Sequence, residues 1–142
     1  MGRTTSTRTV LGPGGVHVCG RRVLCDPRIS TMVATSLKYF HDARVLTGDF
    51  IVMPNHVHVL MTPLPRFELE DILQAIKSYT GTQINKVLRL EGAFWQRESY
   101  DHIVRDWKQL EAFQRYIAAN PEKAKLNSGE YILSTARYVP AC

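Results

Sequence analysis

Hydrophobic positions recur at helical spacing in three parts of the chain. The first stripe predicts a helix over 26–42, in which Asp26 serves as N-cap and Pro27 takes the first helical position. The second stripe predicts a long helix over 68–89. The third predicts a helix over 106–121 that begins at an N-cap aspartate and ends at a proline.

Strand-like apolar runs lie between these stripes. They predict a strand over 44–53, interrupted by a Gly-Asp pair that favours a turn, and a second strand within 50–61 that two prolines close. An edge strand or hairpin is predicted over 93–103, and 131–133 forms a short apolar segment. This order predicts a layered α+β domain with helices packed on an antiparallel sheet.

The ends of the chain carry weaker patterns. Residues 1–15 are rich in Thr, Arg and Gly and have no period, which predicts a flexible N-terminal arm. A short strand is predicted over 16–24, although a Gly-Arg-Arg run interrupts it. We therefore assign the domain to 16–133 and a C-terminal tail to 134–142.

Composition is that of one ordinary globular domain. The 142 residues are 44% hydrophobic and 22% charged, enough for a sizeable core. A formal net charge of +5 favours a polyanionic partner without identifying it. Three cysteines without a CxxC pair predict reduced thiols in a cytoplasmic protein. The chain has no apolar run of about 18 residues, so we expect no membrane association.

Two histidines occupy alternate positions of the strand within 50–61. Side chains two residues apart share one face of a strand, so His56 and His58 present two imidazoles to one point while Val57 and Val59 face the core. Such a pair can bind a divalent ion if a third group joins it. Taken alone, His-x-His is equally compatible with incidental histidines on a half-exposed strand.

A tyrosine and an asparagine lie one turn apart on the third predicted helix. Leu110, Phe113 and Ile117 mark its apolar stripe, while Tyr116 and Asn120 share another face. Tyrosine can act as a covalent nucleophile, and an amide oxygen can complete a metal shell. Taken alone, Tyr116 is more simply a surface tyrosine. Tyr79 and Tyr100 are rival nucleophiles, but neither is followed by such an asparagine.

Four motifs in this order resemble the IS200-like transposases, and within them the branch associated with repetitive extragenic palindromes. They are Met-Pro-Asn-His-Val-His-Val-Leu at 53–60, Ile-Lys-Ser-Tyr-Thr at 76–80, Phe-Trp-Gln-Arg-Glu-Ser-Tyr-Asp-His-Ile-Val-Arg-Asp at 94–106 and Tyr-Ile-Ala-Ala-Asn-Pro at 116–121. The resemblance covers residues 24–133.

The resemblance implies a ferredoxin-like fold and a single-strand DNA nuclease site. His56, His58 and Asn120 would hold a divalent metal, Mg²⁺ or Mn²⁺, and Tyr116 would form a 5′-phosphotyrosine intermediate. The DNA partner would be single-stranded, hairpin or palindromic. Covalent storage of the phosphodiester requires no nucleotide cofactor. A single nucleophilic tyrosine in the motif implies that two protomers, as a homodimer, are needed to cleave both ends of a mobile DNA element.

Four side chains are candidate DNA contacts. Lys77, Arg97 and Arg105 could neutralise phosphates, and an arginine can bind phosphate oxygens in a bidentate way. Lys77 would equally suit a solvated helix face. Trp95 could stack on an unpaired base, although the same pattern is more typical of a core tryptophan in a sheet.

One feature of the family has no convincing equivalent here, namely a central strand ahead of the first helix. Either residues 16–24 replace it or the strand is missing, which would leave an open edge beside the histidine strand.

Three functional classes follow. The leading one is an active transposase-type nuclease and strand transferase, for DNA transposition and recombination. The second is a DNA-binding module on the same fold that does not cut, impaired by the missing strand. The third, an unrelated metal hydrolase, ranks last because no further His or Asp lies close after His58.

Overall fold

The computed structural model describes residues 8–10, 16–17, 23–95 and 101–135. In chain order its elements are β1 (Arg8–Val10), β2 (Val16–His17), the 3-10 helix η1 (Val23–Cys25), α1 (Pro27–Tyr39), β3 (Val45–Val52), β4 (His56–Pro63), α2 (Leu69–Leu88), β5 (Asp101–Ile103), α3 (Trp107–Lys123) and β6 (Ile132–Ser134). The predicted α+β class is confirmed.

The strands form one antiparallel sheet in the order β5-β1-β4-β3-β6, and β2 also pairs with β4. Elements β1, α1, β3, β4, α2 and β5 make a β-α-β-β-α-β unit, which is the ferredoxin-like arrangement. Helix α3 and strand β6 follow this unit. The histidine strand β4 therefore lies inside the sheet, paired along both edges.

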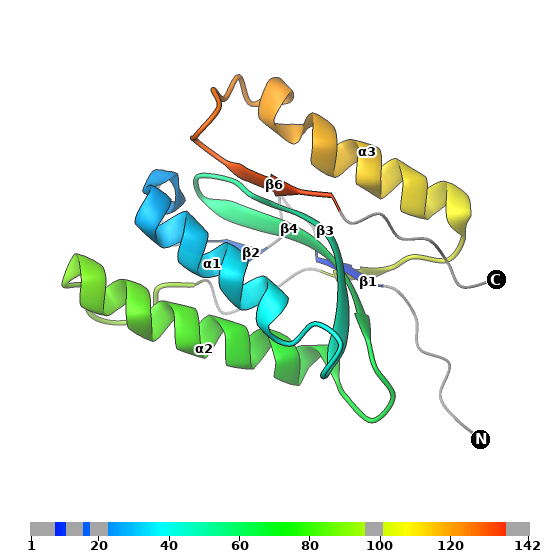
Figure 1. Ribbon diagram of the computed structural model, residues 1–142, viewed down its shortest axis with the longest axis horizontal. Helices are drawn as coiled ribbons and strands as arrows, with labels where there is room; N and C mark the ends of the chain where they lie inside the picture. The colour runs from blue at the N-terminus through cyan, green and yellow to red at the C-terminus, as the bar shows by residue number, and fades with distance from the viewer. Residues whose placement is uncertain (1–7, 11–15, 18–22, 96–100, 136–142) are drawn as a thin grey trace.

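Helices cover both faces of the sheet (Figure 1): α1 and α2 lie on one face and α3 on the other. Alternate side chains of β3 face opposite sides of the sheet. Phe50 and Val52 belong to the larger core that α1 and α2 complete. Ile51 and Met53 belong to a smaller core with Ile117 of α3. The period of two along β3 thus builds two separate cores.

A short strand precedes the first helix, upstream of the 16–24 segment that the sequence offered as its replacement. Arg8–Val10 pairs antiparallel with residues 59–61 of β4 and with β5. Val16 and His17 of β2 pair with Val57 and His56 further along β4. The predicted flexible arm over 1–15 is therefore wrong for residues 8–10, while 1–7 and 11–15 lie outside the described residues. Backbone pairing beside β4 is satisfied by a segment too short to show periodicity.

Strand β3 runs through the Gly-Asp pair that the sequence suggests as a turn. Its pairing register with β4 shifts between Thr47 and Phe50, which is a β-bulge at Gly48 and Asp49. The hairpin turn comes later, where Met53 N donates to His56 O at 2.8 Å. A bulge adds one residue to a strand without ending it, so the Gly-Asp pair marks a bulge and not the turn that the sequence suggested.

Two further observations concern a cysteine and the helices. Cys25 is a free thiol. Within the described residues no helix has the length and apolar character needed to cross a lipid bilayer.

Replacing Gly81 by alanine is expected to stabilise the protein by about 0.5 to 1 kcal/mol, because glycine is the weaker helix former. Gly81 lies inside α2, and an added Cβ would sit 3.7 Å from side-chain atoms of Phe94 and Trp95, an ordinary van der Waals distance. Urea unfolding should show a higher midpoint at an unchanged slope.

Gly92→Ala is the matched control for this prediction. Gly92 has a φ of +86°, which an alanine adopts only with strain, although the space around it is open. This variant should lower the midpoint. A lower midpoint for Gly81→Ala as well would show that Phe94 and Trp95 cannot accommodate the methyl group.

Candidate active site

Strand β4 directs two imidazoles toward the face of the sheet that α3 covers. His58 pairs with Ile51, a member of the core under α3, and is only 1% exposed, while His56 is half-buried. Their ring centres are 4.6 Å apart and the ring planes are inclined by 75°. The predicted common face of the two histidines is confirmed by this geometry.

The neighbouring Asn55 orients the outer imidazole. Nδ1 of His56 lies 2.7 Å from Oδ1 of Asn55. The amide oxygen accepts a hydrogen bond only when Nδ1 carries the proton, and in that tautomer Nε2 has its lone pair available as a ligand. A hydrogen bond of this kind commonly orients a metal-binding histidine.

Helix α3 brings the tyrosine to the same place. The carboxylate of Asp106 caps the helix by accepting from Gln109 N at 2.9 Å, as predicted for an N-cap. Ile117 is fully buried against the sheet. The adjacent Tyr116 is 36% exposed, with its ring centre 5.5 Å from that of His58. The phenol therefore stands beside the histidine pair and remains open to solvent.

Asn120 follows one turn after Tyr116 on α3. Its Nδ2 donates to the Tyr116 carbonyl oxygen at 3.1 Å. With the amino group used on the backbone, the amide oxygen Oδ1 is the atom that could serve as a ligand. The helix does not end at Pro121, contrary to the prediction, and continues to Lys123 with Pro121 buried inside it. Only the last turn follows the proline, so few helical hydrogen bonds depend on it.

The helix continues far enough to bring in a residue that sequence reasoning missed. Lys123 Nζ lies 5.7 Å from the centre of the Tyr116 ring. A spacing of seven residues would have indicated this proximity, but the expected helix end at Pro121 removed Lys123 from consideration.

The donor set fits a divalent ion. Imidazole nitrogens are ligands that many divalent ions accept, and the two rings lie close together, with their centres 4.6 Å apart. Over 8–10, 16–17, 23–95 and 101–135, no three His, Cys, Asp or Glu side chains form a metal-binding group. Among the described residues, the amide oxygen of Asn120, one turn after Tyr116 on α3, is a candidate third ligand.

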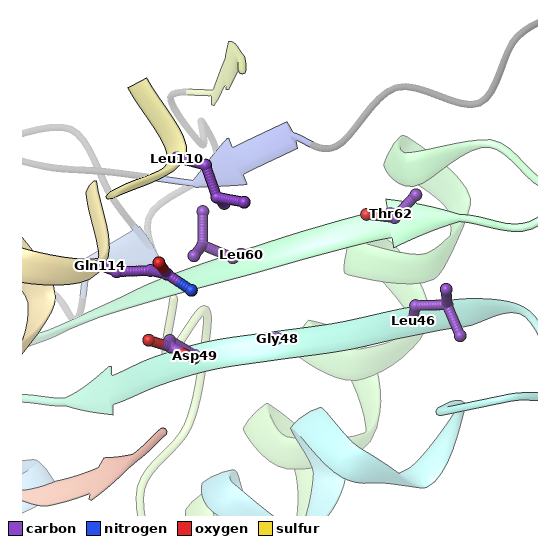
Figure 2. A pocket seen from close by; sticks show the side chains of 7 residues that line it. All are labelled: Leu46, Gly48, Asp49, Leu60, Thr62, Leu110 and Gln114. Atoms are coloured by element: carbon purple, nitrogen blue, oxygen red, sulfur yellow. The ribbon is translucent and has the colours of Figure 1, made fainter. Parts of the chain in front are cut away.

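A small cavity of about 20 Å³ lies between the sheet and α3 (Figure 2). Its volume suits about one water molecule. Figure 2 shows Leu110 and Gln114 of α3 beside β3 and β4, where Leu60 and the bulge residue Asp49 line the cavity. Asp49 is a carboxylate of only 5% exposure. Because the sequence suggested a turn here, this buried acid beneath α3 was not foreseen.

The candidate DNA contacts lie in different places. Arg105 is exposed, just before α3, and its backbone N donates to Gln109 Oε1 at 2.8 Å. Lys77 is half-buried on α2, in the layer opposite α3, and burial lowers the pKa of its ammonium group. Arg97 lies outside the described residues.

Trp95 is a core residue. It is 7% exposed and its indole Nε1 donates to Thr80 Oγ1 at 2.8 Å. A ring enclosed in this way has no open face for a base, so we withdraw Trp95 from the DNA contacts. The sequence already favoured the core for this side chain.

Comparison with known proteins identifies the family and the fold. The family model "Transposase IS200 like" matches residues 21–120. A solved structure of a REP-associated tyrosine transposase bound to a REP hairpin has 21% sequence identity and a TM-score of 0.67, over 87% of this chain and 71% of that chain. At this identity the likeness shows a common fold. No curated protein sequence matches the chain. The family match spans the histidine strand, the tyrosine and Asn120, and this chain belongs to the IS200-like transposase family.

Proposed function

We propose that this chain is a metal-dependent, transposase-type endonuclease and strand transferase that acts on single-stranded DNA. The observation that carries the proposal is the position of Tyr116, with its ring centre 5.5 Å from that of His58 and its side chain open to solvent. A nucleophile beside a pair of potential metal ligands is what phosphodiester cleavage through tyrosine requires.

In the proposed reaction the Tyr116 oxygen attacks phosphorus and forms a 5′-phosphotyrosine bond. The bond from phosphorus to the 3′ oxygen breaks, and the departing oxygen takes a proton to become a 3′-hydroxyl. Attack by a 3′-hydroxyl on the phosphotyrosine reverses the step and joins DNA strands. When bound through His56, His58 and Asn120, Mg²⁺ or Mn²⁺ would polarise a non-bridging oxygen of the phosphate.

The proposed partner is a DNA hairpin with a single-stranded flank. A net charge of +5 supports a polyanionic partner. The structurally similar transposase is bound to a REP hairpin, which supports the same class of DNA here. Arg105 is exposed just before the helix that carries Tyr116, and it is therefore a candidate for a phosphate contact near the site. Lys77 and Arg97 remain proposed contacts.

One tyrosine at the site supports a further part of the proposal, that two protomers act together when both ends of a mobile DNA element are cut.

The alternative of a non-cutting DNA-binding module depended on a missing strand beside β4. Strand β1 pairs with β4 at that position, so the structural reason for impaired activity no longer applies.

The test is incubation of the full chain with Mn²⁺ and a panel of labelled single-stranded DNA hairpins that carry randomised flanks. Denaturing electrophoresis should show a covalent protein–DNA band that requires metal and disappears with a chelator. Retained hairpin binding without any band would favour the binding module. Absence of both would contradict the proposed function.

A further inference from the structure

Three polar side chains follow one face of α3. Tyr116, Asn120 and Lys123 are separated by four and seven residues, and such positions lie above one another on an α-helix. Lys123 joins this row only because α3 continues through Pro121. Its ammonium group therefore comes from the same rigid element that positions the proposed nucleophile.

Two nitrogen-bearing groups lie near the Tyr116 ring. The His58 ring is on the sheet side, 5.5 Å away between ring centres, and Lys123 Nζ is 5.7 Å from the centre of the tyrosine ring. In the part of the chain that the structure describes, no Asp or Glu forms an ion pair with Lys123. Its charge is thus next to the phenol and not neutralised by a described carboxylate.

We propose that Lys123 is a catalytic residue that binds the phosphoryl group while it moves between DNA and Tyr116. The inference rests on the proposed function. As the phosphorus–Tyr116 oxygen bond forms and the bond to the 3′ oxygen breaks, negative charge concentrates on the non-bridging oxygens. The ammonium group donates hydrogen bonds to one of them, while the phenol proton leaves to water and the 3′ oxygen gains a proton from water.

The charge and length of lysine suit this role. A lysine is a compact cation on a flexible four-carbon stem, and it can follow a phosphate that shifts position during transfer. Lys123 also has a simpler role, because a positive charge in the last turn interacts favourably with the helix dipole and stabilises the helix. That role would affect the stability of α3 but would not affect the chemical step in folded protein, so the two can be separated.

The experiment compares the wild-type chain with Lys123→Gln, Lys123→Arg and Lys125→Gln. Lys125 is an exposed lysine just beyond the end of α3 and gives a matched control for loss of one positive charge. Each protein is mixed with Mn²⁺ and a saturating labelled hairpin. The single-turnover rate of covalent adduct formation is measured, hairpin affinity is measured separately, and thermal unfolding checks folding.

Lys123→Gln should slow adduct formation by about 100- to 1,000-fold, the order expected for loss of one donor to a charged transition state. Hairpin affinity should change by less than about threefold, since this is one phosphate contact among several. Lys123→Arg should recover most of the rate, and Lys125→Gln should remain within about twofold of wild type.

Two results would overturn the proposal while leaving the proposed function intact. One is wild-type adduct formation by folded Lys123→Gln. The other is an equal loss of rate in Lys123→Gln and Lys125→Gln with a parallel loss of affinity, which would indicate general attraction to DNA. Failure of the wild-type chain to form any adduct would instead overturn the proposed function, and this inference with it.

Discussion

Tyr116→Phe should abolish the covalent protein–DNA adduct and lower cleavage of single-stranded hairpins by at least about a thousandfold, because the variant has no nucleophilic oxygen. Phenylalanine keeps the ring that packs at 5.5 Å from His58, and the side chain is 36% exposed. The free energy of unfolding should therefore change by less than about 0.5 kcal/mol. Denaturing electrophoresis of the labelled hairpin measures the adduct, and gel shift measures binding, which should persist.

Tyr79→Phe is the matched control. Tyr79 is 58% exposed on α2, in the helical layer on the opposite side of the sheet, so this variant should form the adduct at the wild-type rate. An adduct that persists in Tyr116→Phe would assign the nucleophile to another residue. Loss of the adduct in Tyr79→Phe would assign it to α2.

His56→Ala should reduce the rate of metal-dependent cleavage by more than about 100-fold. Loss of a residue that is only hydrogen-bonded to a metal ligand costs about 10- to 100-fold, and loss of the ligand itself should cost more. His56 is the better choice of the two histidines because it is half-buried, whereas His58 is 1% exposed and its removal would leave a cavity. Cleavage should be measured against Mn²⁺ concentration. The increase in melting temperature that Mn²⁺ gives the wild type should be lost.

Asn55→Ala gives a graded comparison. It removes only the contact at 2.7 Å to Nδ1 of His56 and should weaken metal affinity by about 10-fold. Equal metal dependence in wild type and His56→Ala would rule out His56 as a ligand. In that case the separation of 4.6 Å between the two rings would reflect packing alone.

Local signals predicted most of the helices. Asp26 with Pro27, and Asp106, start α1 and α3 where the sequence predicts, because a capping side chain acts on backbone groups two or three residues away. The predicted 68–89 helix agrees with α2 to within a residue at each end. The helix end at Pro121 was wrong, since burial of the proline against the fold outweighs its local preference.

Short strands were the weakest part of the sequence prediction. Strand β1 has three residues, too few to display alternation, and it exists because β4 and β5 supply pairing partners on both sides. The bulge at Gly48 and Asp49 has the same explanation. Whether a Gly-Asp pair turns the chain or only shifts its register depends on the neighbouring strand.

The sequence by itself determined the family resemblance, the α+β class and the identity of four candidate site residues, because motif spacing on one strand and one helix sets which side chains share a face. Only the tertiary structure decided that α3 brings Tyr116 beside His58, that Trp95 is enclosed in the core against Thr80 and that Lys123 reaches the tyrosine. These are contacts between segments distant in sequence or across an unexpected helix continuation. The first two contacts follow from packing of the whole domain, which no local pattern encodes, and the third depends on α3 continuing through Pro121.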